Sequence, residues 1–228
     1  MSLDDLKTVH FFNLDANAPF YKFFMSSTFP WELLAKIGEF VKGLGASLSL
    51  SDYDKAGDDI WISKVASISD YVTIQGPAII EAGVQLRPGA FIRGNAYIGP
   101  RTVVGTATEV KNALLLSHVE VPHYNYIGDS ILACGAHMGA GSITSNLRAD
   151  KRSVTVRYQG ESINTNLRKF GAIVGESVEV GCNAVLNPGV LIGRGSIVYP
   201  LSSVRFSVPP HHIHKQMGEM VRMLERPE

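Results

Sequence analysis

The chain of 228 residues is long enough for one large domain, or for one domain with appendages. Its 21 basic and 21 acidic side chains give a formal net charge of zero, which argues against a general nucleic-acid binder because such proteins carry a basic excess. The two cysteines, Cys134 and Cys182, form no CxxC pair, so we expect neither a disulfide framework nor a zinc cluster, and we expect a cytoplasmic location. Acidic residues near the N-terminus argue against a signal peptide, and no apolar run is long enough to span a membrane.

Residues 1–60 are predicted to form a helical appendage. The segment "FPWELLAKIGEFVKGLG" places Pro30 at a helix start and glycines at its end. Its apolar positions follow the spacing of one helix face, and they are Trp31, Leu33, Leu34, Ile37, Phe40 and Val41. We therefore expect a short amphipathic helix that covers part of the surface or one end of the neighbouring domain.

Residues 61–208 carry a repeat of six residues, marked by aliphatic side chains in two runs. The runs are Ile62, Ile68, Ile74, Ile80, Leu86, Ile92, Ile98, Val104, Val110 and Leu116, then Val174, Val180, Leu186, Ile192, Val198 and Val204. Neither the period of a helix nor that of an ordinary strand produces a pure repeat of six. Hexapeptide periods are typical of parallel β-helices, in which the aliphatic residue points inward and three hexapeptides make one coil of about eighteen residues. The alternative, a β-sandwich with accidental spacing, is disfavoured by the length of the runs.

The repeat is interrupted between the two runs. In "VPHYNYIGDS" the next position of the series is Pro122, and His123, Tyr124 and Tyr126 follow it closely. Residues 147–169 break the pattern completely and carry six Arg or Lys side chains, so we interpret them as a loop ejected from the coil stack. Within this loop, "VTVRYQGESI" alternates around Gln159-Gly160 and predicts a β-hairpin. Residues 209–228 are predicted to form a C-terminal helix.

Polar residues distant in sequence can meet on one edge of a β-helix. Coils stack at the spacing of β-strands, roughly 4.8 Å, so residues about eighteen or thirty-six positions apart can share an edge. Arg87, Lys111, His123 and Asn146 are candidates for such an edge. Arg and Lys bind phosphate, and His exchanges protons near neutral pH, so this combination predicts a site for an anionic substrate.

The ordered motifs also carry a family resemblance. The repeat together with "LRPGAFIRGNAYIG", "EVKNALL", "PHYNYIGDS", "AHMGAGSITSN" and "FGAIVGESVEVGCNAVLNPGVLIG" closely resembles the acetyltransferase domain of bifunctional UDP-N-acetylglucosamine pyrophosphorylase/glucosamine-1-phosphate N-acetyltransferases. The loop "NLRADK…RKFGAIVGE" is more similar to archaeal sugar-phosphate nucleotidylyltransferases that carry the same domain. The resemblance covers about residues 74–208 and implies an all-β fold, a left-handed parallel β-helix. It also implies a homotrimer with the site between neighbouring prisms.

The resemblance implies roles for the residues that match its motifs. His123 matches the general base, and Asn146 matches a position that faces acetyl-CoA and orients the acetyl carbonyl. Ala140 matches a second position on the acetyl-CoA side. The matches to ligands of the sugar phosphate are Arg87, Lys111, Tyr126 and either Lys151 or Arg152.

Three positions depart from the family pattern. His137 stands in the substrate site where the bacterial proteins usually carry Asn, Leu147 replaces a Tyr on the acetyl-CoA side, and Cys182 replaces a Ser that contacts CoA. These departures bear on the identity of the acceptor and on how CoA is held.

The implied reaction is a direct transfer in which acetyl-CoA is the cosubstrate and no metal is required. The 2-amino group of a hexosamine 1-phosphate attacks the thioester, His123 removes a proton, and backbone N–H groups or Asn146 stabilise the oxyanion. In cells this activity would serve the supply of UDP-N-acetylglucosamine. We expect no pyrophosphorylase activity, because the roughly sixty residues before the repeat contain no Gly-rich nucleotide-binding loop.

Two alternative functions are considered. His118 and His123 form the H-x4-H pair of γ-class carbonic anhydrases, and His137 could only loosely supply the third ligand that a catalytic zinc ion needs. A metal assay on the purified protein would detect that function. The other alternative is a non-catalytic scaffold or a sensor of sugar nucleotides, which calorimetry with acetyl-CoA would separate from an enzyme.

Overall fold

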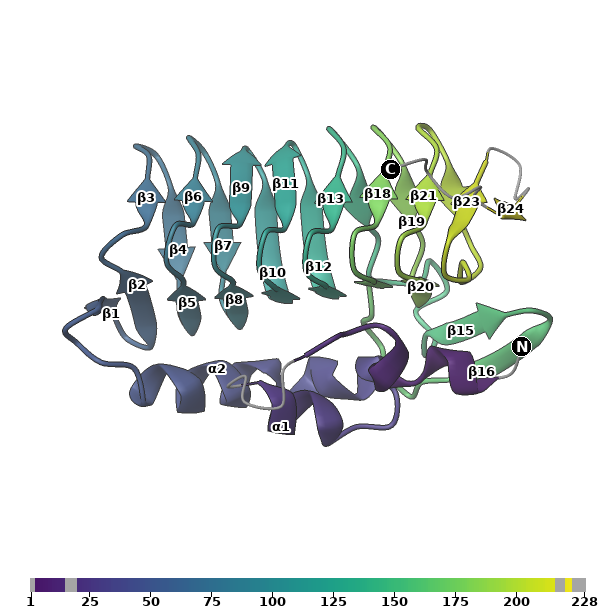
Figure 1. Ribbon diagram of the computed structural model, residues 1–228, viewed down its shortest axis with the longest axis horizontal. Coiled ribbons are helices and arrows are strands. Elements are labelled where there is room, and N and C mark those ends of the chain that lie inside the picture. Colours follow the sequence, from purple (N-terminus) through teal and green to yellow (C-terminus); the bar gives the residue numbers. More distant parts are fainter. Residues whose placement is uncertain (1–2, 15–19, 216–219, 223–228) are drawn as a thin grey trace.

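The computed structural model describes residues 3–14, 20–215 and 220–222, and it confirms the left-handed parallel β-helix (Figure 1). Strands stack along one long axis, with the N-terminal coils at one end and the C-terminal coils at the other. Three strands make each complete coil, so the solenoid is a prism with three faces and three corners.

The first face is a ladder of short parallel strands. These are β3 (Ser67–Ile68), β6 (Gln85–Leu86), β9 (Val103–Thr106), β11 (Glu120–His123), β13 (His137–Met138), β18 (Glu179–Val180), β21 (Ile197–Val198) and β23 (His212–His214). The last strand, β24 (Met220–Arg222), pairs with β23 in the antiparallel sense.

The second and third faces belong to one sheet, because β10 (Glu109–Leu115) and β12 (Tyr126–Leu132) continue through the corner between them. The second face contains β4 (Thr73–Gln75), β7 (Phe91–Arg93), the first halves of β10 and β12, β14 (Ile143–Thr144), β19 (Val185–Leu186) and β22 (Ser203–Val204). The third face contains β2 (Ile60–Ser63), β5 (Ala78–Ile80), β8 (Ala96–Ile98), the second halves of β10 and β12, β17 (Ala172–Val174) and β20 (Val190–Ile192). At the N-terminal end of the third face, β1 (Tyr53–Gly57) pairs antiparallel with β2.

Each corner turns the chain through a left-handed backbone conformation. The first corner, between the first and second faces, includes Tyr124 (φ 53°) and Asn183 (φ 56°). The second corner, between the second and third faces, includes Asn112 and Asp129, both with φ 48°. The third corner includes Arg101 and His118, both with φ 58°. Asn and Asp adopt this conformation more readily than other residues with side chains, whereas Tyr at such a position is uncommon.

The inward positions follow the predicted first run up to Val110, differ from it at Leu116, and follow the predicted second run from Val174 to Val204. Leu115 lies in the core of the prism, and Leu116 packs outside it beneath the helices. The chain needs only five residues from Val110 to Leu115, because it turns sharply at Asn112. Val121 therefore takes the next inward position, and Pro122 follows it, which agrees with the predicted interruption of the repeat at Pro122.

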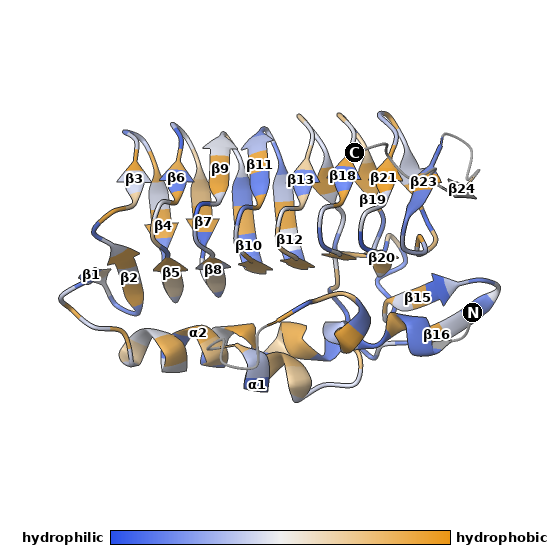
Figure 2. Ribbon diagram, viewed as in Figure 1, coloured by the Kyte–Doolittle hydropathy of each residue, from blue (hydrophilic) through white to orange (hydrophobic). Residues whose placement is uncertain are grey.

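The helical appendage covers the third face. It comprises η1 (Leu3–Leu6), η2 (Thr8–His10), α1 (Tyr21–Met25), η3 (Pro30–Lys36) and α2 (Ile37–Ala46). The outward residues of the third-face strands are apolar and buried under it, and they include Ile79, Tyr97, Leu114, Ile131, Ile173 and Leu191. Figure 2 shows apolar strands and apolar helix surfaces facing each other across this layer.

The predicted amphipathic helix is present as two consecutive pieces, η3 and α2. The side chain of Glu32 accepts hydrogen bonds from the backbone N–H groups of Thr28 (3.0 Å) and Phe29 (3.2 Å) and so caps the start of η3. A Cβ on Gly45 would lie 2.3 Å from the ring of Trp61, so glycine is what allows α2 to approach the solenoid here.

The two remaining segments have different outcomes. The predicted hairpin is present as β15 (Thr155–Tyr158) and β16 (Glu161–Asn164), joined at Gln159 and Gly160, both with positive φ. The predicted C-terminal helix is wrong where the structure describes it, because His212–His214 adds a parallel strand to the first face and Met220–Arg222 folds back on it. The remaining residues of that prediction lie outside the described ranges. Among the described residues, no helix has the length and apolar character needed to cross a membrane.

Candidate functional site

The first corner aligns three of the predicted site residues in successive coils. The backbone carbonyl of His123 accepts from the N–H of Gly141 (2.9 Å), and the carbonyl of Ala140 accepts from the N–H of Asn183 (2.8 Å). The carbonyl of Cys182 continues the same ladder. His123, Ala140 and Cys182 therefore form one row along the edge of the prism, in which the His123 and Cys182 side chains are exposed and Ala140 is half-buried.

Arg87 belongs to the same corner but lies at a neighbouring position. It directly follows β6. The equivalent positions on the next two coils are Gly105 and Pro122, so Arg87 lies two coils before Pro122, the residue that precedes His123. Its side chain is half-buried.

The second corner holds a polar cluster around the buried carboxylate of Asp129. This carboxylate accepts from the amide Nδ2 of Asn112 (2.9 Å) and from the amide Nδ2 of Asn146, and the ammonium Nζ of Lys111 lies 3.4 Å from both of its oxygens. Asp129 is only 5% exposed. A buried carboxylate requires such partners, because burying an unpaired charge is costly.

Tyr126 joins this cluster from the second face. Its hydroxyl oxygen accepts a hydrogen bond from Asn146 Nδ2 (3.1 Å). Burial, together with the negative charges of Asp129 and Glu109, raises the pKa of the Tyr126 phenol, so it stays protonated at neutral pH. Its ring lies over Gly128, where a Cβ would be 2.5 Å from the hydroxyl oxygen, so a larger residue would displace the ring.

The sequence interpretation did not single out Asp129, Asn112 or the pair formed by Arg93 and Glu109. Arg93 Nη1 lies 2.6 Å from Glu109 Oε1, on the second face next to Tyr126. The available signal was the spacing of Asn112, Asp129 and Asn146, each seventeen residues after the previous one. A coil of three hexapeptides has about eighteen residues, and the five-residue step at this corner shortens it to seventeen.

Within one chain, the predicted residues therefore fall into two groups at opposite ends of the same strands. The register of β12 and β14 places Asn146 level with Asp129, six residues beyond His123. Six residues of extended chain span roughly 20 Å. His123 and Asn146 of a single chain therefore lie at different corners of the prism.

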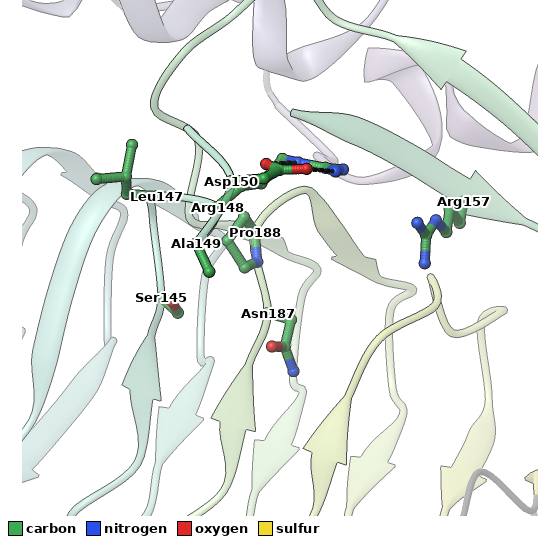
Figure 3. A pocket seen from close by; sticks show the side chains of 8 residues that line it. All are labelled: Ser145, Leu147, Arg148, Ala149, Asp150, Arg157, Asn187 and Pro188. Atoms are coloured by element: carbon green, nitrogen blue, oxygen red, sulfur yellow. Dashed lines mark hydrogen bonds and ion pairs between the residues drawn. The ribbon is translucent and has the colours of Figure 1, made fainter. Parts of the chain in front are cut away.

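The ejected loop forms a pocket of about 430 Å³ beside Asn146 (Figure 3). Its lining residues are Ser145, Leu147, Arg148, Ala149, Asp150, Arg157, Asn187 and Pro188. Arg148 is paired with Asp150, whereas Arg157 approaches the pocket from β15, on the side opposite Leu147. Lys151 and Arg152, the predicted phosphate ligands, are exposed residues of the loop and do not line this pocket.

Two of the three histidines considered as metal ligands have other side-chain partners. His137 Nδ1 lies 2.7 Å from a carboxylate oxygen of Glu179 on the first face, and His118 Nε2 accepts from Arg101 Nε (3.0 Å) at the third corner. Within the described ranges, no three His, Cys, Asp or Glu side chains are grouped to hold a metal ion.

Comparison with known proteins identifies the family. Residues 74–168 match the family model of the GMPPB C-terminal domain. The chain is 31% identical over 162 residues to YaiX of Escherichia coli, described as an uncharacterized acetyltransferase, and the match covers 68% of each chain. This chain belongs to the left-handed β-helix acetyltransferase family.

Longer family members carry the match in only part of their length. The bifunctional protein GlmU of Methanococcus vannielii is 32% identical over 187 residues, which cover 74% of this chain and 41% of the relative. The bifunctional sugar-1-phosphate nucleotidylyltransferase/acetyltransferase of Sulfurisphaera tokodaii is 33% identical over 177 residues, which cover 69% of this chain and 44% of the relative. The chain thus spans less than half the length of these two relatives. Among solved structures, PerB of Caulobacter crescentus in complex with CoA and GDP-perosamine is similar at 20% identity, with a TM-score of 0.36 and coverage of 71% of this chain and 56% of that one.

Proposed function

We propose that this β-helix acetyltransferase family member is an acetyl-CoA-dependent N-acetyltransferase that acts on a hexosamine 1-phosphate. The observation that carries the proposal is the cluster at the second corner, where Lys111, Tyr126 and Asn146 are held around one buried carboxylate. A cation and a protonated phenol beside an amide suit a phosphorylated sugar. The name of the Sulfurisphaera tokodaii relative, which combines sugar 1-phosphate and acetyltransferase, agrees with this substrate class.

In the proposed reaction the acetyl group moves directly between the two substrates. The 2-amino nitrogen attacks the thioester carbonyl, the C–N bond forms, and the C–S bond breaks with release of the CoA thiolate. His123 accepts the proton that the amine loses, a role that suits an exposed imidazole on the edge of the prism. Alignment of the two substrates supplies a further part of the rate enhancement.

We further propose that the complete site forms between neighbouring copies in a homotrimer. The base lies at the first corner with Arg87, whereas Lys111 and Asn146 lie at the second corner, six residues of extended chain away, or roughly 20 Å. A base must lie within hydrogen-bonding reach of the proton that it abstracts. A neighbouring copy that brings its His123 row against the second-corner cluster satisfies this requirement.

The test measures the consumption of acetyl-CoA in the presence of glucosamine 1-phosphate, galactosamine 1-phosphate and other amino sugars. The readout is the release of the CoA thiol. We expect turnover with a hexosamine 1-phosphate and a loss of at least about 100-fold in His123→Ala, because a general base contributes that much. The circular dichroism spectrum of His123→Ala should match that of the wild type, since this side chain is exposed. Absence of turnover with every amino sugar would refute the reaction class, and full activity of His123→Ala would refute the assignment of the base.

A further inference from the structure

We infer that Asp129 is a positioning residue of the proposed transfer site, which fixes Asn146 as a hydrogen-bond acceptor toward the sugar amine and leaves Tyr126 as the donor. The inference rests on the proposed function, and it names a residue and two roles that the family resemblance does not supply. It also excludes stabilisation of the oxyanion by Asn146, one of the two possibilities given above, and leaves the backbone N–H groups.

The orientation of the Asn146 amide follows from its partners. An ionised carboxylate can only accept hydrogen bonds, so the amide atom that faces Asp129 must be the donor Nδ2. The same Nδ2 donates to the Tyr126 hydroxyl at 3.1 Å. An amide nitrogen carries two hydrogens, so both are used within the cluster.

The carbonyl oxygen of Asn146 is therefore the atom that this side chain offers to a ligand. The side chain is half-buried, and none of the described residues donates a hydrogen bond to Oδ1. An oxyanion needs a donor, so Asn146 in this orientation does not stabilise one. Its Oδ1 instead suits the N–H of an amine, which leaves backbone N–H groups as the oxyanion donors.

Tyr126 has the complementary role. Because Asn146 can only donate at Nδ2, the Tyr126 oxygen accepts in that bond and its own O–H proton remains available for the substrate. The raised pKa of the phenol keeps that proton in place.

Asp129 also anchors this corner of the prism. Asn112 Nδ2 bridges the Asp129 carboxylate (2.9 Å) and the backbone carbonyl of Leu34 in η3 (3.2 Å), so the cluster is tied to the helical appendage. The Lys111 ammonium compensates the carboxylate charge, at 3.4 Å from both oxygens. Removing the charge of Asp129 without changing its shape would release both Asn146 and Lys111.

The test is Asp129→Asn, which is nearly isosteric and tolerates the left-handed backbone at this position. The control is Asp59→Asn, because Asp59 has a similar backbone (φ 55°) and a lysine partner, Lys42 at 3.3 Å, but lies at the N-terminal end of the solenoid. In Asp129→Asn we expect kcat to fall about tenfold or more with an unchanged KM for acetyl-CoA, because hydrogen bonds to a charged group are lost. Asp59→Asn should keep wild-type kinetics.

A second measurement is independent of activity. In the wild type, both side-chain amide protons of Asn146, assigned by their absence in Asn146→Ser, should exchange slowly with solvent in NMR spectra. Asp129→Asn should accelerate this exchange at least about tenfold, and Asp59→Asn should not. Unchanged exchange in Asp129→Asn, or wild-type kcat in that variant, would overturn the inference. If the wild type acetylates no amino sugar, the proposed function fails while the exchange measurement still decides whether Asp129 orients Asn146.

Discussion

Complementation between two inactive variants tests whether the site is shared by neighbouring copies. We choose His123→Ala, which removes the base, and Asn146→Ala, which removes the amide at the second corner. Each variant alone should be impaired in every copy of the oligomer. When the two chains are coexpressed with different tags and isolated as mixed oligomers, a site that takes His123 from one chain and Asn146 from its neighbour can be intact.

The expected magnitude follows from the geometry. In a chain of either type, six residues of extended chain, or roughly 20 Å, separate His123 from the level of Asn146, so in the proposed shared site the two groups come from different chains. Every isolated mixed trimer contains both chain types, so one of its three shared sites combines an intact base with an intact amide. Activity should therefore recover to about one third of the wild-type value.

The assay is acetyl-CoA turnover by the mixed oligomers, with a matched negative control. Lys111→Ala mixed with Asn146→Ala should recover nothing, because both residues contact Asp129 in the same chain and neither variant chain supplies an intact cluster. Mixed His123→Ala and Asn146→Ala oligomers that are no more active than the two single variants would refute the shared site. Recovery in the Lys111→Ala mixture would equally contradict the grouping of these residues.

Two further predictions concern the stability of the solenoid. Gly105→Ala should lower the free energy of unfolding by about 3 kcal/mol in urea titrations, because its Cβ would lie 1.6 Å from the carbonyl oxygen of Pro122. Gly43→Ala is the contrasting change: this position on α2 has nothing within 4 Å of its Cβ, so alanine should raise the free energy of unfolding by about 1 kcal/mol. An undiminished urea midpoint in Gly105→Ala would contradict the close stacking at the first corner. His214 is 4% exposed and its Nδ1 has no partner in the described part of the chain, and burial lowers its pKa below the ordinary value of about 6.5. The unfolded chain then binds the proton more readily, so the free energy of unfolding should decrease as the pH falls below about 6.5. His214→Leu should reduce this pH dependence. Equal pH profiles of stability for the wild type and His214→Leu would count against a buried neutral imidazole.

The sequence predicted the solenoid because burial imposes the same requirement on every coil. Inward positions such as Leu86, Ile98 and Val180 are aliphatic since each packs against equivalent residues of the coils before and after it. The shift after Val110 was not predictable from the aliphatic residues alone. Leu115 and Leu116 are both leucine, one inside the prism and one under the helices, and only the sharp turn at Asn112 decides between them.

The candidate site was predictable only in part, for a related reason. His123, Lys111, Tyr126 and Asn146 were chosen by motif, and the structure describes a position for each. Asp129, which contacts two of them, Lys111 and Asn146, draws its partners from other coils, so nothing in its immediate neighbourhood indicates a ligand set. Its position in the sequence resembles that of an ordinary turn residue, because Asp is frequent in turns.

The three faces of the prism are not equivalent, and this asymmetry limits how a second copy can pack. The chain's own helices bury the third face, where Tyr97 and Leu114 are almost fully inaccessible. A neighbouring prism therefore cannot pack directly on the strands of the third face. The first corner, between the first and second faces, carries His123 and the side chain of Tyr124, which is 65% exposed although its left-handed backbone is unfavourable for a bulky residue. A copy that packs along this edge would cover Tyr124 and bring an imidazole toward the second face of its neighbour, which is the arrangement that the complementation experiment detects.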